Sequence, residues 1–354
     1  MNTSLVFGLA LVLSLVLTPL MRKIALRTGF VDRPVARSMH TEPKPYLGGV
    51  AIFLAFAAAV LLGGGAKNNE VLGILVGGGL TLLLGIVDDK IRLSAKVKLL
   101  GQIVAAAVLV YYFDVKIDHI YSPLGDKWVH FYGWAGPLTI FWIVAFTNVV
   151  NLIDGLDGLA AGISSIASLT LLLVSLQNQF ATPIVLTAAL AGAAIGFLRY
   201  NFNPAKIFMG DAGSMFLGYT LAAVSVHGVL KTTVTVGVFV PVLALALPIF
   251  DTAFAIIRRL ATGRSIGEAD KDHLHHRLLR LGLSHRNTVL VMWTISAWLG
   301  LSAVAMTEVS IEQALIIMGM VLLGILFGAK KVGLLDVTAA TPQVTAPKQK
   351  SVGS

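Results

Sequence analysis

The chain has 354 residues, of which 56% are hydrophobic and 13% are charged, and its mean hydropathy is +0.83. This composition excludes a string of water-soluble domains and favours a helical membrane protein, because apolar segments of about 17–25 residues recur along the chain. The absence of cysteine excludes disulfides and thiolate metal sites. A net charge of +9 would suit a nucleic acid, but the distribution of the charges argues against that partner.

About eleven apolar segments have the length that the core of a bilayer requires, so we predict an all-α polytopic membrane protein with about 11 transmembrane helices. The predicted spans cover residues 2–21, 47–63, 71–87, 97–113, 136–150, 159–177, 182–199, 212–230, 236–257, 288–306 and 311–329. The first one has its positive charges after it, which favours an uncleaved span over a signal peptide. We expect one integral-membrane domain over residues 1–335 and a disordered cytoplasmic tail over residues 336–354.

Basic residues set the predicted orientation. With the N-terminus outside and the C-terminus in the cytoplasm, 23 of the 27 Lys and Arg residues fall in cytoplasmic segments, as the positive-inside rule requires. The basic surplus then suits anionic headgroups and anionic substrates and gives no reason to expect a nucleic acid. Outside, residues 115–132 alternate around Ser-Pro-Leu-Gly-Asp, which predicts a small extracytoplasmic β-hairpin.

The first cytoplasmic loop reads VDRPVARSMHTEPKPYLGGV. Arg33, Arg37, His40 and Lys44 supply positive charge for an anionic ligand. The Gly-Gly pair at residues 48–49 allows the backbone to approach another segment closely where the second span begins.

Six carboxylates lie at cytoplasmic span ends or in the loops beside them. Ionisable groups so close to hydrocarbon are costly, which favours a functional site. Solvation of a helix end explains a single carboxylate equally well, but it is the weaker account of six on one face. These residues are Asp88, Asp89, Asp154, Asp157, Asp211 and Asp251.

Asp88 and Asp89 end the third span in the sequence LLLGIVDDK. Neighbouring residues of a helix point about 100° apart, so the two carboxylates can share a cation without binding it identically. Mg²⁺ prefers one or two carboxylates, waters and substrate phosphates. The pair is a weak motif by itself.

The stretch NVVNLIDGLDGLAAG, residues 148–162, joins two apolar spans through a short polar elbow. It places Asn148, Asn151, Asp154 and Asp157 together at the membrane surface. The elbow is too short for a twelve-residue calcium loop, so we expect it to bind a substrate.

Asp211 lies in NFNPAKIFMGDAGS, immediately before the eighth span. An aspartate there is also a common helix N-cap, and this alternative stays open. The same short loop holds Asn201, Lys206 and Phe208, a combination of amide, cation and aromatic ring that suits a nucleobase and phosphates.

Further along, Pro241 and Pro248 predict a kink in the ninth span. The segment EADKDHLHHRLLRLG then predicts an amphipathic helix at the membrane interface. Its His273, His275 and His276 are candidates for binding phosphate. A basic helix on anionic lipid is the alternative, and no HExxH pattern supports a zinc site.

Five motifs in order resemble those of the polyprenyl-phosphate N-acetylhexosamine-1-phosphate transferases of bacterial envelope synthesis. They are DRPVARSMHTEPKPYLGG, VDDK, NVVNLIDGLDGLAAG, NPAKIFMGDAGS and DKDHLHHRLL, between about residues 28 and 285. The first and last motifs look more like the N-acetylglucosamine-1-phosphate branch than like the branch that transfers phospho-N-acetylmuramoyl-pentapeptide.

The resemblance implies a Mg²⁺-dependent enzyme, with Mn²⁺ as a possible substitute, that transfers N-acetylglucosamine 1-phosphate from UDP-GlcNAc to undecaprenyl phosphate and releases UMP. It implies a multi-pass protein of the bacterial inner membrane with a cytoplasmic active site, and a homodimer. The implied metal ligand is Asp211, beside the acidic pair Asp88 and Asp89. The implied substrate contacts are Asn201, Phe208 and Asp157 on the uridine, Asn151 and Asp154 near the diphosphate, and His273, His275 and His276 near the phosphates and sugar; Asn148, Lys44 and His40 complete the predicted substrate-binding set.

The chemistry suggests in-line attack of the lipid phosphate on the β-phosphorus, with Asp88 removing any residual proton and the kinked ninth span shaping a groove for the polyprenyl chain. A covalent aspartyl-phosphate route stays open. So does the same chemistry with another UDP-N-acetylhexosamine or with UDP-MurNAc-pentapeptide. A secondary transporter is disfavoured because transporters place polar residues near the bilayer midplane, where this chain is almost bare. A scaffolding protein would leave the carboxylates unexplained.

Overall fold

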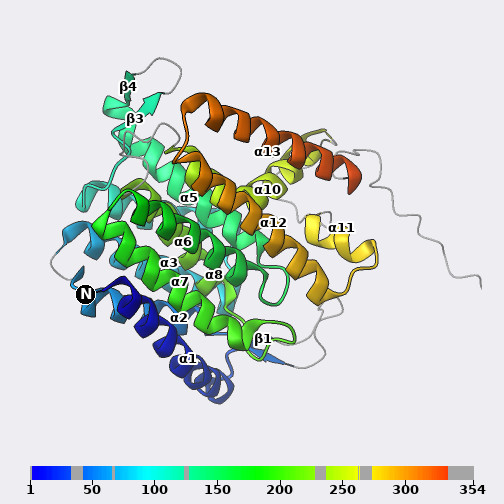
Figure 1. The fold of residues 1–354 in the computed structure, drawn as a ribbon. Coiled ribbons are helices and arrows are strands. Elements are labelled where there is room, and N and C mark those ends of the chain that lie inside the picture. The colour runs from blue at the N-terminus through cyan, green and yellow to red at the C-terminus, as the bar shows by residue number, and fades with distance from the viewer. Residues whose placement is uncertain are drawn as a thin grey trace, which may run out of the picture.

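The structure is a computed structural model, and it describes residues 2–32, 43–65, 68–122, 127–227, 237–261, 263 and 273–333. Long helices run side by side in one bundle (Figure 1). The helices are α1 (Thr3–Thr28), α2 (Gly48–Leu62), α3 (Asn69–Ile91), α4 (Ala95–Ala107), α5 (Ala135–Ile153), α6 (Leu159–Gln177), α7 (Ala181–Asn201), α8 (Gly210–His227), α9 (Phe239–Ala244), α10 (Ala246–Ala261), α11 (Leu274–Arg280), α12 (His285–Met306) and α13 (Ile311–Lys331). A π-helical turn, η2 (Val108–Tyr112), extends α4, and a 3₁₀ turn, η3 (Tyr132–Trp134), precedes α5.

The helices confirm the predicted polytopic membrane protein. Within the described residues, eight helical segments are long and apolar enough to cross a bilayer: α1, α3, α4 with η2, α5 with η3, α6, α7, α12 and α13. The other three predicted spans are not among these eight. Residues 47–63 form α2, which has only 15 residues, and the described part of 212–230 lies in α8, which has 18 residues and begins at Gly210.

The third of these spans, predicted over residues 236–257, is divided at Leu245 into α9 and α10. Pro248 has no N–H to donate to the carbonyl of Ala244, and its ring would clash with that carbonyl in a continuous helix. The kink predicted from the two prolines is therefore confirmed, and it is a full break between two helices.

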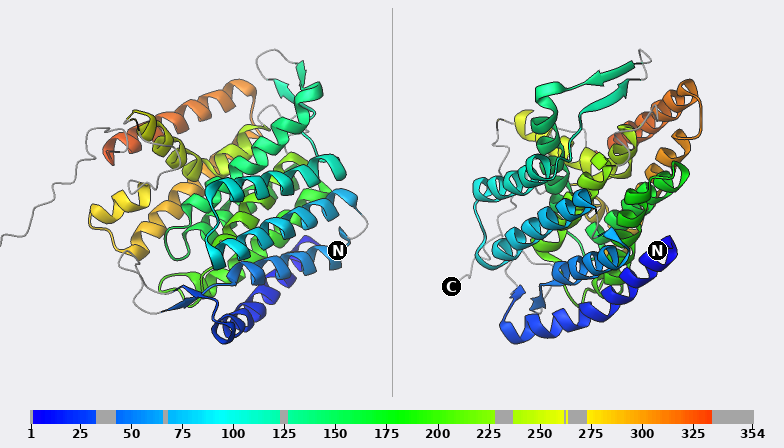
Figure 2. Two further views of the ribbon diagram at one scale, coloured as in Figure 1. Left: turned by 180° about the vertical axis from the view of Figure 1, so that it is seen from behind. Right: turned by 90° about the vertical axis from the view of Figure 1, so that its left-hand side faces the viewer.

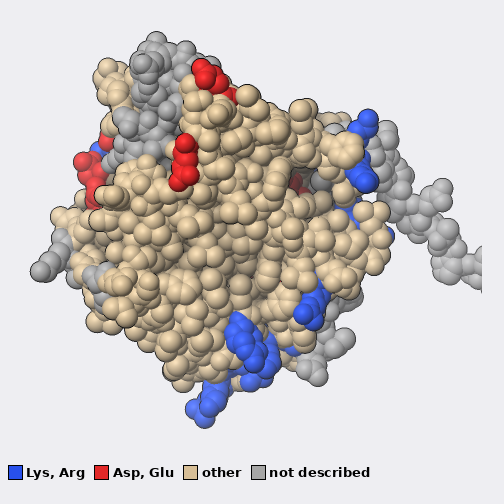
Figure 3. Space-filling model, viewed as in Figure 1, with Lys and Arg blue, Asp and Glu red and all other residues tan. Residues whose placement is uncertain are grey.

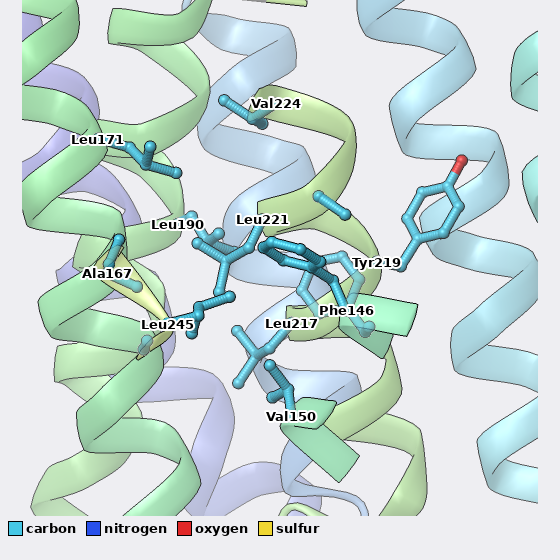
Figure 4. Packing of buried hydrophobic residues seen from close by; sticks show 14 of the residues in the cluster. Phe146, Val150, Ala167, Leu171, Leu190, Leu217, Tyr219, Leu221, Val224 and Leu245 are labelled. Carbon is cyan, nitrogen blue, oxygen red and sulfur yellow. The ribbon is translucent and has the colours of Figure 1, made fainter. Parts of the chain in front are cut away.

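Helix α8 lies at the centre of the bundle and is buried along almost its whole length. It packs against α3 and α5, with α2, α6 and α7 also in contact, while α1 covers α7 and α2 on the outside (Figure 2). Aliphatic and aromatic side chains of α5, α6, α7 and α8 interdigitate in this core, where Phe146, Leu190, Leu217 and Leu221 lie close together (Figure 4). Helix α13 packs mainly on α12 at the edge of the molecule.

Two small antiparallel sheets lie at opposite ends of the bundle. Strands β3 (His119–Ser122) and β4 (Lys127–His130) pair with His119 opposite His130, which confirms the predicted hairpin. Strands β1 (Val31–Asp32) and β2 (Lys44–Pro45) pair across the first loop, an association that the sequence pattern did not predict.

We call the end with β1, β2 and α11 the site end and the opposite end the hairpin end. On the face drawn in Figure 3, acidic residues lie towards the hairpin end and most basic residues towards the site end. A broad band with almost no charged residues separates them, as expected for a surface in contact with lipid.

Candidate active site

A cavity of about 450 Å³ opens at the site end, between the α5–α6 elbow, the start of α8, β1–β2 and α11. The described residues that line it include eight of the predicted site residues. These are Asp89, Asp154, Asp157, Asn201, Phe208, Asp211, His275 and His276. Asp88, Asn151 and His273 lie behind this lining in contact with its members, whereas His40 falls outside the described residues.

An ionic cluster occupies the floor of the site, where α3, α4 and α8 meet. The Lys98 ammonium contacts Asp88 Oδ2 at 2.7 Å and also contacts the Asp211 carboxylate. Asn151 Nδ2 donates to Asp211 Oδ1 at 3.0 Å, and the Leu93 amide donates to Asp88 Oδ1 at 2.7 Å. Lys98 was not among the predicted site residues. Its position beside the acidic pair, at the start of the next helix, was the available signal.

Asp89 caps the N-terminus of α8 from a neighbouring helix. Its two carboxylate oxygens accept the Asp211 and Ala212 amides at 2.8 and 3.3 Å. The alternative in which Asp211 itself caps α8 is therefore wrong, because the cap comes from α3. Gly210, with φ of 70°, lies against this carboxylate and leaves no room for a Cβ. The backbone thus sets the position of Asp211 at the start of α8.

The wall of the cavity carries an excess of negative charge. Five carboxylates line it, and the described part of the lining includes no Lys or Arg. Burial, together with the nearby carboxylates of Asp211, Asp89 and Asp157, raises the pKa of Asp154 to about 8. A cation bound here would relieve the repulsion.

These residues fit a magnesium ion in one particular way. Among the described residues, no three His, Asp or Glu side chains converge on one point as they would around an ion held by protein alone. Asp89 is directed to the start of α8, whereas Asp88 and Asp211 already hold a cation, the Lys98 ammonium, between them. Two carboxylates completed by substrate phosphates and water are the usual Mg²⁺ environment. Of the three predicted metal ligands, Asp88 and Asp211 form the pair that fits this environment, and the assignment of Asp89 stays a prediction.

The elbow between α5 and α6 forms one side of the cavity and is fixed by the α7–α8 connection. Asp157 Oδ2 accepts hydrogen bonds from Asn203 Nδ2 at 3.1 Å and from the Ala205 amide at 2.9 Å. Asn201 Oδ1 accepts the Gly158 amide at 3.0 Å, and its Nδ2 donates to the Ile207 carbonyl. The predicted uridine contacts therefore lie together on one rigid shelf.

The first loop joins the site through its backbone. The Phe208 amide donates to the Pro45 carbonyl at 2.9 Å, and the Gly48 amide donates to the Phe208 carbonyl at 3.0 Å. Tyr46 therefore lies beside Phe208, with ring centroids 6.3 Å apart, and lines the cavity. Burial and the Asp32 carboxylate raise the pKa of Tyr46 above its ordinary value. Lys44 lies opposite Asp32 in the β1–β2 ladder, outside the lining.

Asn148 lies one helical turn deeper than Asn151. Its Nδ2 donates to Gln102 Oε1 at 2.7 Å, and Gln102 also contacts Met215. This bond joins α5 to α4, and Asn148 does not reach the described lining of the cavity. Asn148, which was predicted to contact the substrate, therefore lies between two helices and outside the described lining of the cavity.

The three histidines of the α11 segment separate into two groups. His273 Nδ1 lies 2.9 Å from Asp251 Oδ2, and the Leu274 amide donates to Asp251 Oδ1 at 2.7 Å, so that Asp251 anchors the start of α11. His275 and His276 line the cavity. His275 is 2% exposed, and its Nδ1 has no hydrogen-bond partner in the described structure. Burial and the neighbouring His276 lower the pKa of His275 to about 3.

A second cavity, of about 410 Å³, lies between α10, α11, α12 and α13. Its lining is apolar except for Asp251, and it includes Phe250, Phe254, Trp298 and Gly328. Asp251 contacts His273, whose ring is stacked on that of His275 with centroids 5.8 Å apart. Three side chains therefore separate the apolar cavity from the polar one.

His285, the first residue of α12, is a further lining residue that the sequence analysis missed. Its Nε2 accepts the Asp157 amide at 3.0 Å. A histidine three residues before the predicted span 288–306 was the available signal.

Known proteins with similar sequences place these features in a family. Residues 71–229, which include the acidic pair, the elbow and Asp211, match the family described as Glycosyl transferase family 4. The chain is 40% identical over 331 residues to a probable undecaprenyl-phosphate N-acetylglucosaminyl 1-phosphate transferase of Bacillus subtilis, covering 93% of this chain and 92% of that protein. It is 37% identical over 311 residues to a decaprenyl-phosphate N-acetylglucosaminephosphotransferase of Mycolicibacterium smegmatis, covering 80% and 76% of the two chains. It is 33% identical over 335 residues to a phospho-N-acetylmuramoyl-pentapeptide-transferase of Desulforudis audaxviator, covering 84% and 96%.

The identity extends along nearly the whole chain, and the matched region contains the carboxylates that surround Lys98 and the shelf at the elbow. The chain belongs to glycosyl transferase family 4.

Proposed function

We propose that this protein transfers N-acetylglucosamine 1-phosphate from UDP-GlcNAc to undecaprenyl phosphate and releases UMP. The observation that carries the proposal is the adjacency of two cavities, one lined by carboxylates and the other by hydrocarbon. A reaction between a charged nucleotide sugar and a phosphate on a long apolar chain needs both. The Bacillus subtilis relative carries this activity in its name.

The uridine end of the donor fits the shelf. Asp157 and Asn201 are held there by hydrogen bonds, and Phe208 with Tyr46 offers aromatic surface for the base. A nucleobase is bound by hydrogen bonds in the plane of the base and by an aromatic ring that stacks on its face, and the shelf offers both kinds of group.

The diphosphate fits the ionic cluster. Asp88 and Asp211 would hold the Mg²⁺ ion, which when bound would neutralise phosphate charge. Lys98 keeps the two carboxylates at a fixed separation, and Asn151 orients Asp211 through its Oδ1. Both oxygens of Asp88 already have partners, so its predicted role as proton acceptor is the less favoured one. The lipid phosphate is anionic at neutral pH and does not need a strong base.

The acceptor fits the apolar cavity. Its walls come from α10, α11, α12 and α13, so a polyprenyl chain there would lie beside the break between α9 and α10. Asp251, His273 and His275 lead from this cavity to the polar one. A lipid phosphate at their boundary would attack the β-phosphorus in line, and the bond from that phosphorus to UMP would break.

N-acetylglucosamine is the favoured sugar because identity is 40% and 37% to relatives named for N-acetylglucosamine, against 33% to one named for the muramoyl-pentapeptide. We place the site end in the cytoplasm of a bacterium and the N-terminus outside, since 23 of 27 basic residues then follow the positive-inside rule. The homodimer implied by the resemblance stays a prediction.

A panel of UDP-sugars tests the proposal. Purified protein in detergent is given each sugar with undecaprenyl phosphate, and released UMP is measured with and without lipid and with and without Mg²⁺. We expect UMP from UDP-GlcNAc only when lipid is present. If UDP-MurNAc-pentapeptide were the only sugar nucleotide from which UMP is released in the presence of lipid, the protein would belong to the branch that transfers phospho-N-acetylmuramoyl-pentapeptide. If the protein were reconstituted into vesicles and took up UDP-GlcNAc without releasing UMP, the result would support the alternative that it is a secondary transporter.

A further inference from the structure

We propose that His285 is a positioning residue for nucleotide recognition: it holds the backbone of Asp157 so that one carboxylate oxygen stays available to the uridine. The inference rests on the proposed function of the same cavity. His285 comes from α12, 128 residues away from Asp157 in sequence, and its Nε2 lies 3.0 Å from the Asp157 amide nitrogen. Both residues line the cavity.

Asp157 is fixed at both its backbone and its side chain. His285 binds the amide, while Asn203 and the Ala205 amide both bind Oδ2. The described residues donate no hydrogen bond to Oδ1, which leaves this oxygen as the free acceptor. The next amide, that of Gly158, is bound by Asn201. The direction of Asp157 Oδ1 is therefore determined by partners from two segments, the α7–α8 connection and α12. His285 is the partner that comes from α12.

The bond requires a lone pair on His285. Because Nε2 accepts the amide proton, the neutral ring carries its own proton on Nδ1. A phenylalanine would keep the shape of the ring but would offer no acceptor. A glutamine would place an amide oxygen at about the reach of Nε2 and would restore the acceptor.

Packing contacts attach α12 to the bundle independently of this bond. The Arg286 guanidinium lies 5.6 Å from the centre of the Phe202 ring, and Trp293 packs on the same ring at 5.2 Å. Trp293 also fills the space that a side chain on Gly162 would occupy. These contacts hold α12 against the bundle without the hydrogen bond of His285. The loss of that bond should therefore affect the position of Asp157 and leave the position of α12 unchanged.

The test compares H285F with H285Q. We expect H285F to raise the KM for UDP-GlcNAc by about five- to tenfold, the usual effect of one lost hydrogen bond, because the free Asp157 oxygen loses its fixed direction. The kcat and the KM for undecaprenyl phosphate should stay near the wild-type values. H285Q should return the KM for UDP-GlcNAc close to wild type. R286A, which weakens only the packing of α12, serves as the matched control and should leave that KM unchanged.

An unchanged KM in H285F, or an equal rise in H285F and H285Q, would overturn the inference. A fall in kcat without a change in KM would also do so, since it would give His285 a role in the chemical step. The dissociation constant of UMP, measured by calorimetry on the same variants, separates this inference from the proposed function. UMP binding needs no turnover, so weaker binding to H285F and restored binding to H285Q would support the role of His285 even if the wild type transferred no GlcNAc phosphate. If the wild type bound no UMP, the inference would fail.

Discussion

The two cavities of this protein have nearly the same volume and opposite linings. The polar one, of about 450 Å³, is built from helix ends and loops, and hydrogen bonds and ion pairs fix its walls. The apolar one, of about 410 Å³, is built from the sides of α10, α11, α12 and α13. This difference indicates that binding and turnover in the polar cavity should depend on individual polar groups. Binding in the apolar cavity should depend instead on the volume that its side chains leave open.

Asp211→Asn should have the largest effect, because it removes a charge from the polar cavity and leaves the volume of the side chain unchanged. Lys98 would lose one of its two carboxylate partners, and the cation site would lose half of its fitting pair. We expect kcat to fall by about 10²–10³-fold, as is typical when one group that stabilises transition-state charge is lost. UMP release measures it.

Asp114→Asn is the matched control, since Asp114 is exposed and paired with Lys116 outside both cavities. Its turnover should equal that of the wild type. Near-normal turnover in Asp211→Asn would contradict the role given to the ionic cluster.

Asp251→Asn tests the boundary between the cavities. The change weakens the bond to His273 and the anchor at the start of α11. Hydrogen bonds to a charged group contribute about 1.5–3 kcal/mol, so we expect kcat to fall by at least about tenfold. Both the KM for UDP-GlcNAc and the KM for the lipid should change, and steady-state kinetics in each substrate measures them. A change in only one KM would show that Asp251 serves a single cavity.

Gly328→Leu should affect the apolar cavity alone. Gly328 lines it, and a Cβ there meets no atom within 4 Å, so a leucine side chain begins in open space and takes up volume of the cavity. We expect the KM for undecaprenyl phosphate to rise about tenfold, in line with the loss of a few methylene contacts in an apolar pocket, and the KM for UDP-GlcNAc to stay constant.

Gly319→Leu provides the comparison on the same helix. Gly319 also has open space around it but lies outside the described lining of the cavity. Equal KM values for the lipid in the two variants would remove the polyprenyl chain from this cavity.

His275→Gln should give the smallest effect on stability, which is measured through the pH dependence of unfolding. The pKa of His275 is about 3 in the folded protein against an ordinary value of 6.5, so the unfolded chain takes up a proton first as the pH falls. The contribution of this neutral ring to stability is therefore complete above about pH 6.5 and is lost at up to about 1.4 kcal/mol per pH unit below it. The midpoint of thermal unfolding should decrease less between pH 7 and pH 5 in the variant than in the wild type. Identical decreases would mean that the ring is not buried as a neutral group.

Local patterns in the sequence were enough to predict several parts of the fold. Apolar length gave the membrane helices, turn residues gave the β3–β4 hairpin, and Pro248 gave the break at Leu245. Within the described residues, eight of the eleven predicted spans coincide with long apolar helices, whereas the other three fall on α2, on α8 and on the pair α9 and α10. The total of about eleven spans stays a prediction. Composition cannot distinguish a short helix buried in the bundle from one that spans the membrane.

The chemical content of the site could be predicted better than its connections. The sequence brought Asp89, Asp154, Asp157 and Asp211 to one end of the molecule, and these four residues do line one cavity. It did not reveal that Lys98 contacts Asp211 or that His285 holds Asp157, since these pairs are 113 and 128 residues apart.

Such pairings depend on which helices are neighbours. In a bundle that is apolar on all sides, the periodicity of the sequence gives little information on that point. The same uncertainty explains why Asn148 was expected at the substrate although it contacts Gln102 between two helices.

The glycines that bring α2 and α3 against the start of α8 have a consequence for the response of the enzyme to its membrane. A Cβ on Gly49 or Gly85 would overlap the backbone of residues 211–213, so these three helices meet main chain to main chain. Helices usually adapt to a thinner or thicker bilayer by changing their tilt. Here α2, α3 and α8 can tilt only as one body, while α13, which packs mainly on α12, is free to adjust by itself. Asp211 should then keep its distance from Asp88 and Asp89 across lipids of different chain length.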